Sequence, residues 1–265
     1  MAENPEKRVR TLDRGLVLLE TLAGTEDGLG LTELSQRCGL DKSTAYRLLM
    51  TLLQRGYVRQ NARTRRYSLG LKIFDLYDAA QNGLGLQEVC RPFLRQLLEV
   101  SGETSHLAVL SGWQIVFLDT MRTHQIVGVR TQIGRYEPAY CTALGKAVLA
   151  ALPREEAMSL FKDVELRAYT ALTPTSLDAL AGELDRVAET GYAVDNEEFI
   201  AGVRCVATPV MDVKRQPAGA IGISGPATRL SAERCAALGD VVRRIGESAS
   251  EAMGYSVRRA KTAQE

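Results

Sequence analysis

The chain has 265 residues, of which 45% are hydrophobic and 25% are charged, and its formal net charge is +1. This length suits two domains, and the composition is ordinary for a soluble globular protein. No apolar run approaches the roughly 20 residues of a membrane helix. The start MAENPEKRVR has no apolar stretch behind its charges, so it does not resemble a secretory signal. We therefore expect a cytoplasmic protein.

The five cysteines are odd in number, widely scattered and without a CxxC pair. This pattern predicts reduced thiols rather than a disulfide framework or a structural zinc site, so we expect no metal and no cofactor. The cysteines are Cys38, Cys90, Cys141, Cys205 and Cys235.

Charge is divided unevenly along the chain. Residues 1–72 carry thirteen Lys and Arg against eight Asp and Glu, whereas residues 73–265 carry twenty against twenty-four. A basic first domain on a mildly acidic body indicates a polyanion partner for the first domain alone.

Three helices are predicted at the start of this basic domain. Leucines at positions 12, 16, 19 and 22 repeat at helical spacing, and Gly24 is a suitable stop. Thr32 is a good N-cap for a short second helix that ends at Gly39, and Asp41 can cap a third helix that Gly56 closes. The inward positions of the third helix are Ala45, Leu48, Leu49 and Leu52.

Two helices joined at a sharp angle by a short Gly-containing turn are typical of a helix-turn-helix, here predicted at about residues 30–49. In such a motif the second helix lies in the major groove of DNA and reads bases with its first residues. The positive end of the helix dipole assists phosphate binding there. The candidate DNA-binding residues are Lys42, Ser43, Thr44, Tyr46 and Arg47. A solvated helix start with ordinary caps would show the same pattern.

A two-stranded hairpin is predicted directly after the third helix. Strand-like residues at positions 58, 67 and 69 flank a polar tip at 61–66, where Arg63, Arg65 and Arg66 lie. In a winged helix-turn-helix this wing follows the DNA backbone, and its arginines pair with phosphate. An Arg-rich tip alone is usually a solvated turn, but its position here favours a DNA-binding domain over residues 1–70.

A strongly apolar helix is predicted over residues 71–83, with a broad stripe formed by Ile73, Phe74, Leu76, Tyr77 and Ala80. A helix with such an apolar face, which follows a small domain, is expected to be covered by a partner chain rather than exposed to water. We therefore predict a linker and dimerisation helix at 71–84. Packing against the chain's own body is the alternative.

The second domain is predicted over residues 85–258, followed by a tail at 259–265. A helix is expected from Leu86 to about Gly102, and then strands at 104–110, 113–121 and 125–134. Helices are expected at 141–152, 177–190 and 230–253, and strands at 202–213 and 218–225. Short strands with helices between and around them predict an α+β domain with a largely antiparallel sheet.

Long stretches of the chain resemble the IclR family of transcription regulators. The segments RTLDRGLVLLETLA, GLTELSQRCGLDKSTAYRLLMTLLQRGYV and RYSLGLKIFDL are similar to its DNA-binding half. The segments PAYCTALGKAVLAAL, GYAVDNEEFIAGVRCVATPV and AGAIGISGP follow in the order of that family, and the likeness covers nearly residues 8–255. It implies a winged helix-turn-helix, a dimerising linker helix and a GAF-like effector-binding domain.

The resemblance also implies partners and a site. Relatives form dimers or dimers of dimers, bind pseudo-palindromic operator DNA, commonly as repressors, and respond to a small metabolite, often an organic acid or aromatic carboxylate. The effector pocket of the family corresponds here to Val129, Thr131, Thr142, Ala143, Gly145, Asp195, Cys205 and Ser224. Some relatives have serine where Gly222 stands. Independently of the family, backbone N–H groups at the start of the 142–152 helix can accept an anionic group.

Other readings stay open for the residues of this site. Cys205 alone is most often a buried small hydrophobe, and Asp195 alone a turn or cap residue. A redox- or metal-responsive regulator that uses Cys205 would share the DNA-binding domain. A cysteine-dependent enzyme, pairing Cys141 or Cys205 with His106 or His124, is the remote alternative, since neither histidine lies in a recognised nucleophile motif. We therefore expect a regulator without catalytic activity.

Overall fold

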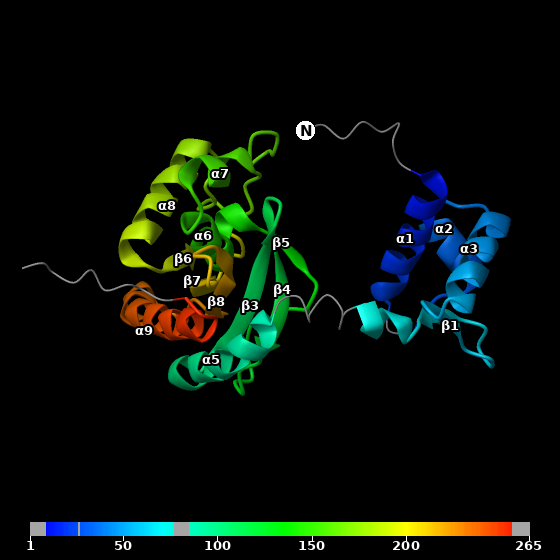
Figure 1. The fold of residues 1–265 in the computed structure, drawn as a ribbon, viewed down its shortest axis with the longest axis horizontal. Coiled ribbons are helices and arrows are strands. Elements are labelled where there is room, and N and C mark those ends of the chain that lie inside the picture. Colours follow the sequence, from blue (N-terminus) through cyan, green and yellow to red (C-terminus); the bar gives the residue numbers. More distant parts are fainter. Residues whose placement is uncertain (1–8, 26, 77–84, 256–265) are drawn as a thin grey trace, which may run out of the picture. The chain divides into compact units, whose positions relative to one another are not determined.

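The computed structural model describes residues 9–25, 27–76 and 85–255. The chain divides between residues 84 and 85 into two compact units, which are drawn as ribbons in Figure 1. None of the helices in the described ranges is long and apolar enough to cross a membrane.

The amino-terminal unit consists of three helices and a hairpin. The helices are α1 (Arg10–Ala23), α2 (Leu31–Arg37) and α3 (Lys42–Gln54), and the strands are β1 (Val58–Gln60) and β2 (Tyr67–Leu69). The core gathers Leu18, Leu22, Leu29, Leu34, Leu49, Val58 and Tyr67. Only the last turns of α1 reach this small core, because Leu12 and Leu16 are 63% and 49% exposed. The start of α1 therefore carries apolar side chains that the unit itself does not cover.

The helix ends follow the predicted caps with one exception. Asp41 accepts a hydrogen bond from the backbone N–H of Thr44 at 2.8 Å and so caps α3. Gly39 ends α2 in the left-handed region at φ 62°, which a residue with a side chain rarely adopts. The prediction for Thr32 was wrong. Helix α2 begins earlier, at Leu31 after Gly30, so Thr32 lies inside the first turn.

The hairpin forms as predicted, and the loop before α2 joins it through an isolated β-bridge at Leu29. Strands β1 and β2 pair antiparallel, and Leu29 exchanges backbone hydrogen bonds of 2.8 and 2.9 Å with Tyr67. Beyond the hairpin, residues 72–76 are helical. The remainder of the predicted linker helix, with Tyr77 and Ala80, lies outside the described residues.

The carboxy-terminal unit is built on an antiparallel six-stranded sheet in the order β5-β4-β3-β8-β7-β6. The strands are β3 (Thr104–Ser111), β4 (Gln114–Met121), β5 (Tyr136–Pro138), β6 (Ala193–Asn196), β7 (Val203–Met211) and β8 (Pro217–Pro226). The α+β prediction with a mainly antiparallel sheet is thereby confirmed.

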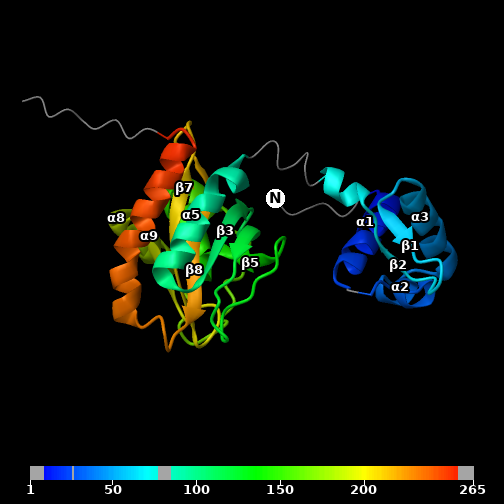
Figure 2. The ribbon, with the colours of Figure 1, turned by 90° about the horizontal axis from the view of Figure 1, so that it is seen from below.

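Helices cover both faces of this sheet. On one face lie α5 (Leu86–Ser101) and α9 (Ala232–Ala252), seen side by side across the strands in Figure 2. The other face carries the short turn η2 (Ala139–Cys141) and the helices α6 (Ala143–Ala150), α7 (Arg154–Ser159) and α8 (Leu177–Thr190). Helix α6 is the innermost of these, and residues 143–149 are all buried.

One predicted strand is absent. Residues 125–134 form an irregular segment, and the edge strand β5 follows it at Tyr136–Pro138. The carbonyl groups of Val127 and Val129 are bound by side chains instead of a neighbouring strand, which explains why the apolar pattern there does not produce a ladder. The short elements α7 and β6 were not predicted.

Candidate functional site

The first candidate site is the exposed start of α3. Lys42, Ser43, Tyr46 and Arg47 are exposed, whereas Thr44 is half-buried. The Ser43 hydroxyl donates to Asp41 at 2.7 Å, and this bond, with that of the Thr44 amide, holds the pKa of Asp41 well below its usual range. Asp41 is thus an anionic cap, and the side chains of Lys42, Tyr46 and Arg47 in the following turns are exposed to solvent.

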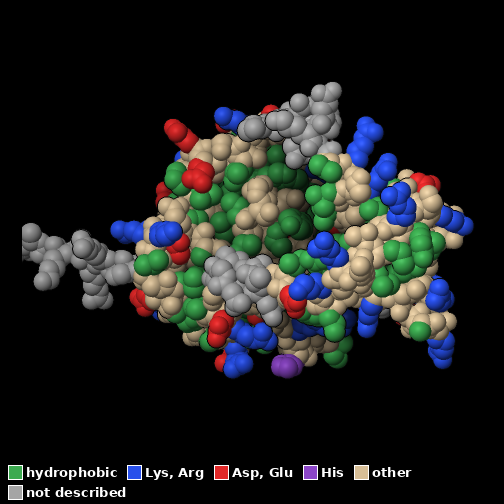
Figure 3. Space-filling model, turned by 45° about the vertical axis from the view of Figure 1, so that its right-hand side comes forward, with side chains coloured by type: hydrophobic (Ala, Val, Ile, Leu, Met, Phe, Trp, Pro, Cys, Tyr) green, Lys and Arg blue, Asp and Glu red, His purple; other side chains and the backbone are tan. Residues whose placement is uncertain are grey.

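The wing tip is an ordered turn. The side-chain oxygen of Asn61 accepts from the N–H groups of Arg63 and Thr64 at 2.9 and 3.1 Å. Arg66 donates to the carbonyl of Gly28 at 2.8 Å, so its guanidinium also ties the wing to the loop before α2. Arg63 and Arg65 are exposed beside it. Figure 3 shows Lys and Arg side chains projecting from this unit with few acidic ones between them.

The second candidate site is a cavity in the carboxy-terminal unit. It lies between the sheet, the start of α6 and the irregular segment before β5, and its volume is about 70 Å³. One ordered water needs only ~10–15 Å³, so this space accommodates a small organic molecule or several waters. The cavity is lined by His106, Ile115, Phe117, Val129, Arg130, Thr131, Arg135, Glu137, Thr142, Ala143, Leu144, Asp195, Phe199, Ile200, Val203, Cys205, Ala207, Gly222, Ile223 and Ser224.

Seven of the eight predicted effector residues line this cavity, and Gly145 does not. Its N–H donates to the Thr142 hydroxyl at 3.3 Å, and a Cβ at this position would lie 2.3 Å from the backbone of Ala139. Gly145 therefore allows α6 to approach the preceding turn closely.

The N-terminus of α6 faces the cavity. The N–H groups of Ala143 and Leu144 belong to the first turn of α6, where N–H groups have no carbonyl partners within the helix. They place the positive end of the helix dipole at the cavity.

Two carboxyl groups face the cavity in poorly solvated surroundings. Burial, reinforced by the charge of Glu198, raises the pKa of Asp195 to about 7. Burial also raises the pKa of Glu137 to about 7, although Arg135, whose Nε lies 3.1 Å from it, opposes the shift. Both groups can therefore exchange a proton near neutral pH.

The cavity also contains an imidazole and a thiol, which are uncharged, beside the cationic side chains of Arg130 and Arg135. His106 shares a 2.6 Å hydrogen bond with Ser224, and its burial lowers its pKa to about 4, which makes the ring neutral at pH 7. Burial and the nearby Asp195 raise the pKa of the Cys205 thiol well above its ordinary value. A protonated thiol is a poor nucleophile and metal ligand, which disfavours the redox, metal and enzyme alternatives for Cys205. No group of three or more His, Cys, Asp or Glu within the described ranges could hold a metal ion.

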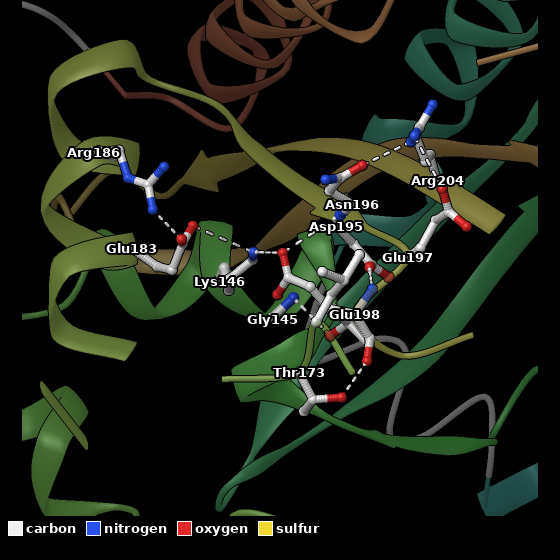
Figure 4. Close-up of polar contacts among 12 residues, drawn as sticks. Gly145, Lys146, Thr173, Glu183, Arg186, Asp195, Asn196, Glu197, Glu198 and Arg204 are labelled. Atoms are coloured by element: carbon white, nitrogen blue, oxygen red, sulfur yellow. Dashed lines mark hydrogen bonds and ion pairs between the residues drawn. The ribbon is translucent and has the colours of Figure 1, made fainter. Parts of the chain in front are cut away.

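A buried ion pair lies behind the cavity wall. Lys146 of α6 is fully buried, and its Nζ lies 2.5 Å from Glu198 and 3.6 Å from Glu183 of α8. The N–H of Glu198 in turn donates to Asp195 at 2.7 Å, as Figure 4 shows. Sequence reasoning missed Lys146, although a lysine inside the apolar run TALGKAVLAAL was a usable signal.

Sequence reasoning did not assign four polar residues to the effector cavity, and it considered one of them, His106, only as a partner of a catalytic cysteine. They are His106, Arg130, Arg135 and Glu137. The serine present in some relatives at position 222 has no room here, since a Cβ there would lie 2.5 Å from the carbonyl of Val206.

Comparison with known proteins decides the family. Residues 11–62 match the family model described as the IclR helix-turn-helix domain, and residues 79–251 match the one described as bacterial transcriptional regulator IclR C-terminal. The chain belongs to the IclR family of transcriptional regulators. It is 36% identical over 249 residues to the acetate operon repressor of Salmonella typhimurium, covering 93% of this chain and 91% of that one.

Solved structures of the IclR family show the same fold. The Thermotoga maritima IclR structure aligns with a TM-score of 0.78 at 28% identity, covering 94% of this chain and 100% of that one. An IclR homolog from Microbacterium hydrocarbonoxydans, crystallised with 4-hydroxybenzoate, aligns with a TM-score of 0.79 at 22% identity, covering 93% and 100%. The resemblance seen in the sequence is thus confirmed.

Proposed function

We propose that this IclR-family chain is a cytoplasmic repressor that binds a pseudo-palindromic operator as a dimer or dimer of dimers and is controlled by a small organic acid. The observation that carries the proposal is the presence, in one chain, of an exposed basic α3 beside an Arg-bearing wing and of a cavity at the start of α6. The names of its relatives, which are transcriptional repressors, support the same function.

DNA binding would divide between the two elements of the amino-terminal unit. Arg47 and Tyr46 stand on the exposed face of α3, so Arg47→Ala and Tyr46→Ala should each weaken specific binding by about 1–3 kcal/mol. Arg63 and Arg65, at the wing, would contact phosphates, so replacing both by Ala should weaken binding to all sequences alike and reduce the salt dependence.

Binding to operator and to unrelated DNA, measured at several salt concentrations, separates these roles. Arg243→Ala, in α9, is the matched control, because Arg243 pairs with carboxylates of its own helix. A wing variant that retained the full salt slope would remove the wing from the interface.

The cavity favours an aromatic or short organic acid. Its walls include Phe117, Phe199 and Ile223, while the N-terminus of α6 and Arg130 supply positive potential for a carboxylate. A relative with the same fold was crystallised with 4-hydroxybenzoate, and another is named for the acetate operon.

A thermal-shift measurement tests this ligand class directly. Ligand at 100 times its Kd stabilises the folded state by about 2.7 kcal/mol, so 4-hydroxybenzoate or acetate should raise the melting temperature. The neutral analogue 4-hydroxybenzyl alcohol should raise it less. Equal shifts with acid and alcohol would exclude recognition of the carboxylate.

Dimerisation would use the apolar side chains left uncovered in the amino-terminal unit. Leu71, Phe74 and Leu76 are 74%, 63% and 53% exposed, and Leu12 and Leu16 of α1 are exposed as well. Water contact with these side chains is unfavourable, so a second copy of the chain is the proposed partner. Replacing Phe74 and Leu76 by serine should reduce the oligomer in sedimentation, and an unchanged oligomer would move the main interface to the carboxy-terminal unit.

A further inference from the structure

A buried acidic residue outside the cavity holds an arginine in a defined position. Glu103, immediately before β3, is 1% exposed, and its two carboxylate oxygens accept from Nε and Nη2 of Arg229 at 2.6 Å each. Room for this carboxylate depends on Gly225, where a Cβ would lie 2.6 Å from it. A buried carboxylate in a two-pronged pair fixes the plane of the guanidinium.

The same arginine contacts the segment of residues 122–133, called here the covering segment, which lines part of the cavity. Nη2 of Arg229 donates to the carbonyl of Val127 at 2.8 Å. Two residues further, the Thr104 hydroxyl donates to the carbonyl of Val129 at 3.1 Å. Val129 and the next two residues, Arg130 and Thr131, line the cavity. Arg229 and Glu103 are not among the lining residues.

The covering segment is also anchored at its start, where the Thr123 hydroxyl donates to the carbonyl of Gly102 at 2.6 Å and the Thr123 N–H donates to the Thr104 hydroxyl at 3.3 Å. Residues 122–133 form neither helix nor strand, and Ile126 and Val127 at its outer side are 103% and 64% exposed. Backbone pairing with β4 resumes only at Gly134, whose N–H donates to Phe117 at 2.8 Å. Between Thr123 and Gly134, the segment that leads into the cavity-lining residues is therefore held by side-chain bonds to the carbonyl groups of Val127 and Val129.

We infer that Glu103 and Arg229 are positioning residues that clamp the 122–133 segment over the cavity and so control the entry and exit of the effector. The inference rests on the proposed function, because it takes the cavity as the effector site. Arg229 acts through the carbonyl of Val127 and does not contact the ligand. Loosening the clamp should leave the cavity walls intact and make both binding and release faster.

Trypsin tests the clamp without a ligand. Arg122 and Arg130 lie in the covering segment, and cleavage there requires the segment to leave the protein surface. Arg229→Lys keeps a positive charge near Glu103, but an ammonium group lacks the planar set of N–H donors with which the guanidinium binds both Glu103 and the carbonyl of Val127. The double variant Glu103→Gln with Arg229→Gln removes both charges and avoids a buried unpaired carboxylate. The matched control is Arg243→Gln, an arginine paired with Asp240 and Glu247 on α9.

We expect cleavage at Arg122 and Arg130 to be about tenfold faster in both clamp variants, and unchanged in Arg243→Gln, because proteolysis follows the population of the open segment. Melting temperatures and the cleavage rates at other sites show whether a variant has lost its fold. Folded clamp variants that are cut at the wild-type rate would overturn the inference.

A second measurement uses 4-hydroxybenzoate as the probe in stopped flow. If it binds, clamp variants should release it about tenfold faster, while the equilibrium affinity changes less, because a looser segment speeds both directions. If a clamp variant is cleaved faster by trypsin but releases 4-hydroxybenzoate at the wild-type rate, the clamp does not control the exit of the ligand. If the probe fails to bind wild-type protein, the proposed ligand class is wrong, but the cleavage result still decides the clamp.

Discussion

Removing the buried Lys146 should strongly destabilise the carboxy-terminal unit. In the variant Lys146→Met, Glu198 keeps its buried position but loses the ammonium group 2.5 Å away. One oxygen of Glu198 already has no hydrogen-bond partner, and in the variant the other oxygen keeps only the long 3.4 Å bond from the N–H of Asn196. Breaking a buried pair by removing one partner costs about 3–5 kcal/mol.

The single tryptophan of the chain makes the measurement specific. Trp113 packs against the core of the carboxy-terminal unit, so its fluorescence follows the unfolding of that unit. With a urea m-value of about 2 kcal/mol/M, the expected loss lowers the unfolding midpoint by about 1.5–2.5 M.

Two further variants make the test of Lys146 decisive. Arg186→Gln removes the exposed partner of Glu183, and a surface pair of this kind contributes less than about 1 kcal/mol. The double variant Lys146→Met with Glu198→Met replaces both members by apolar side chains and should recover much of the loss. The reasoning is refuted if Lys146→Met costs no more than Arg186→Gln.

Three other outcomes are expected. Because the folded-state pKa values of Asp195 and Glu137 are raised to about 7, folding takes up protons at these two groups between about pH 4 and 7, whereas His106, with its pKa lowered to about 4, releases one in the same window. Two carboxyl groups outweigh one imidazole, so the stability of the ligand-free unit should fall as pH rises through this window, and Asp195→Asn with Glu137→Gln should abolish or reverse this fall in urea titrations. Cys205→Trp should fill the cavity and abolish the thermal shift by 4-hydroxybenzoate while operator binding survives; a retained shift would place the ligand elsewhere. Gly145→Ala should cost about 1–3 kcal/mol because its Cβ would meet the backbone of Ala139, whereas Gly182→Ala in the open middle of α8 should be neutral or slightly stabilising in the same titration.

The amino-terminal unit was largely predictable because its signals are local. Asp41 caps α3 and Gly39 ends α2 through contacts within a few residues, and both are visible in the sequence. Thr32 was misassigned because α2 begins two residues earlier than predicted, with Gly30 as an N-cap that makes no side-chain hydrogen bond, and sequence patterns locate helix ends only to within one or two residues. The exposure of Leu12 could not be predicted from its spacing. An apolar stripe shows which face of a helix is buried, but it does not show how much of the helix length the core covers.

In the carboxy-terminal unit, prediction failed where the chain depends on distant partners. The β-branched residues Ile126, Val127 and Val129 are typical of a strand, but Arg229, about a hundred residues away, binds the carbonyl of Val127 that a neighbouring strand would have used. The cavity residues His106 and Glu137 likewise acquire their shifted pKa values only when strands from separate segments bury them together. A single sequence contains no local record of that burial.

In the carboxy-terminal unit, residues 195–198 connect the cavity to the packing of α6 against α8. Asp195 lines the cavity and accepts from the N–H of Glu198, whose side chain binds Lys146. Lys146 lies one turn beyond Thr142 on α6, so the same helix presents its N-terminus to the cavity and its lysine to α8. A ligand carboxylate at the start of α6 would favour the protonated form of Asp195, because two anions in this poorly solvated space repel each other. A change at the cavity would then act directly on the hydrogen bond that positions Glu198, and from there on the buried pair that holds α6 against α8.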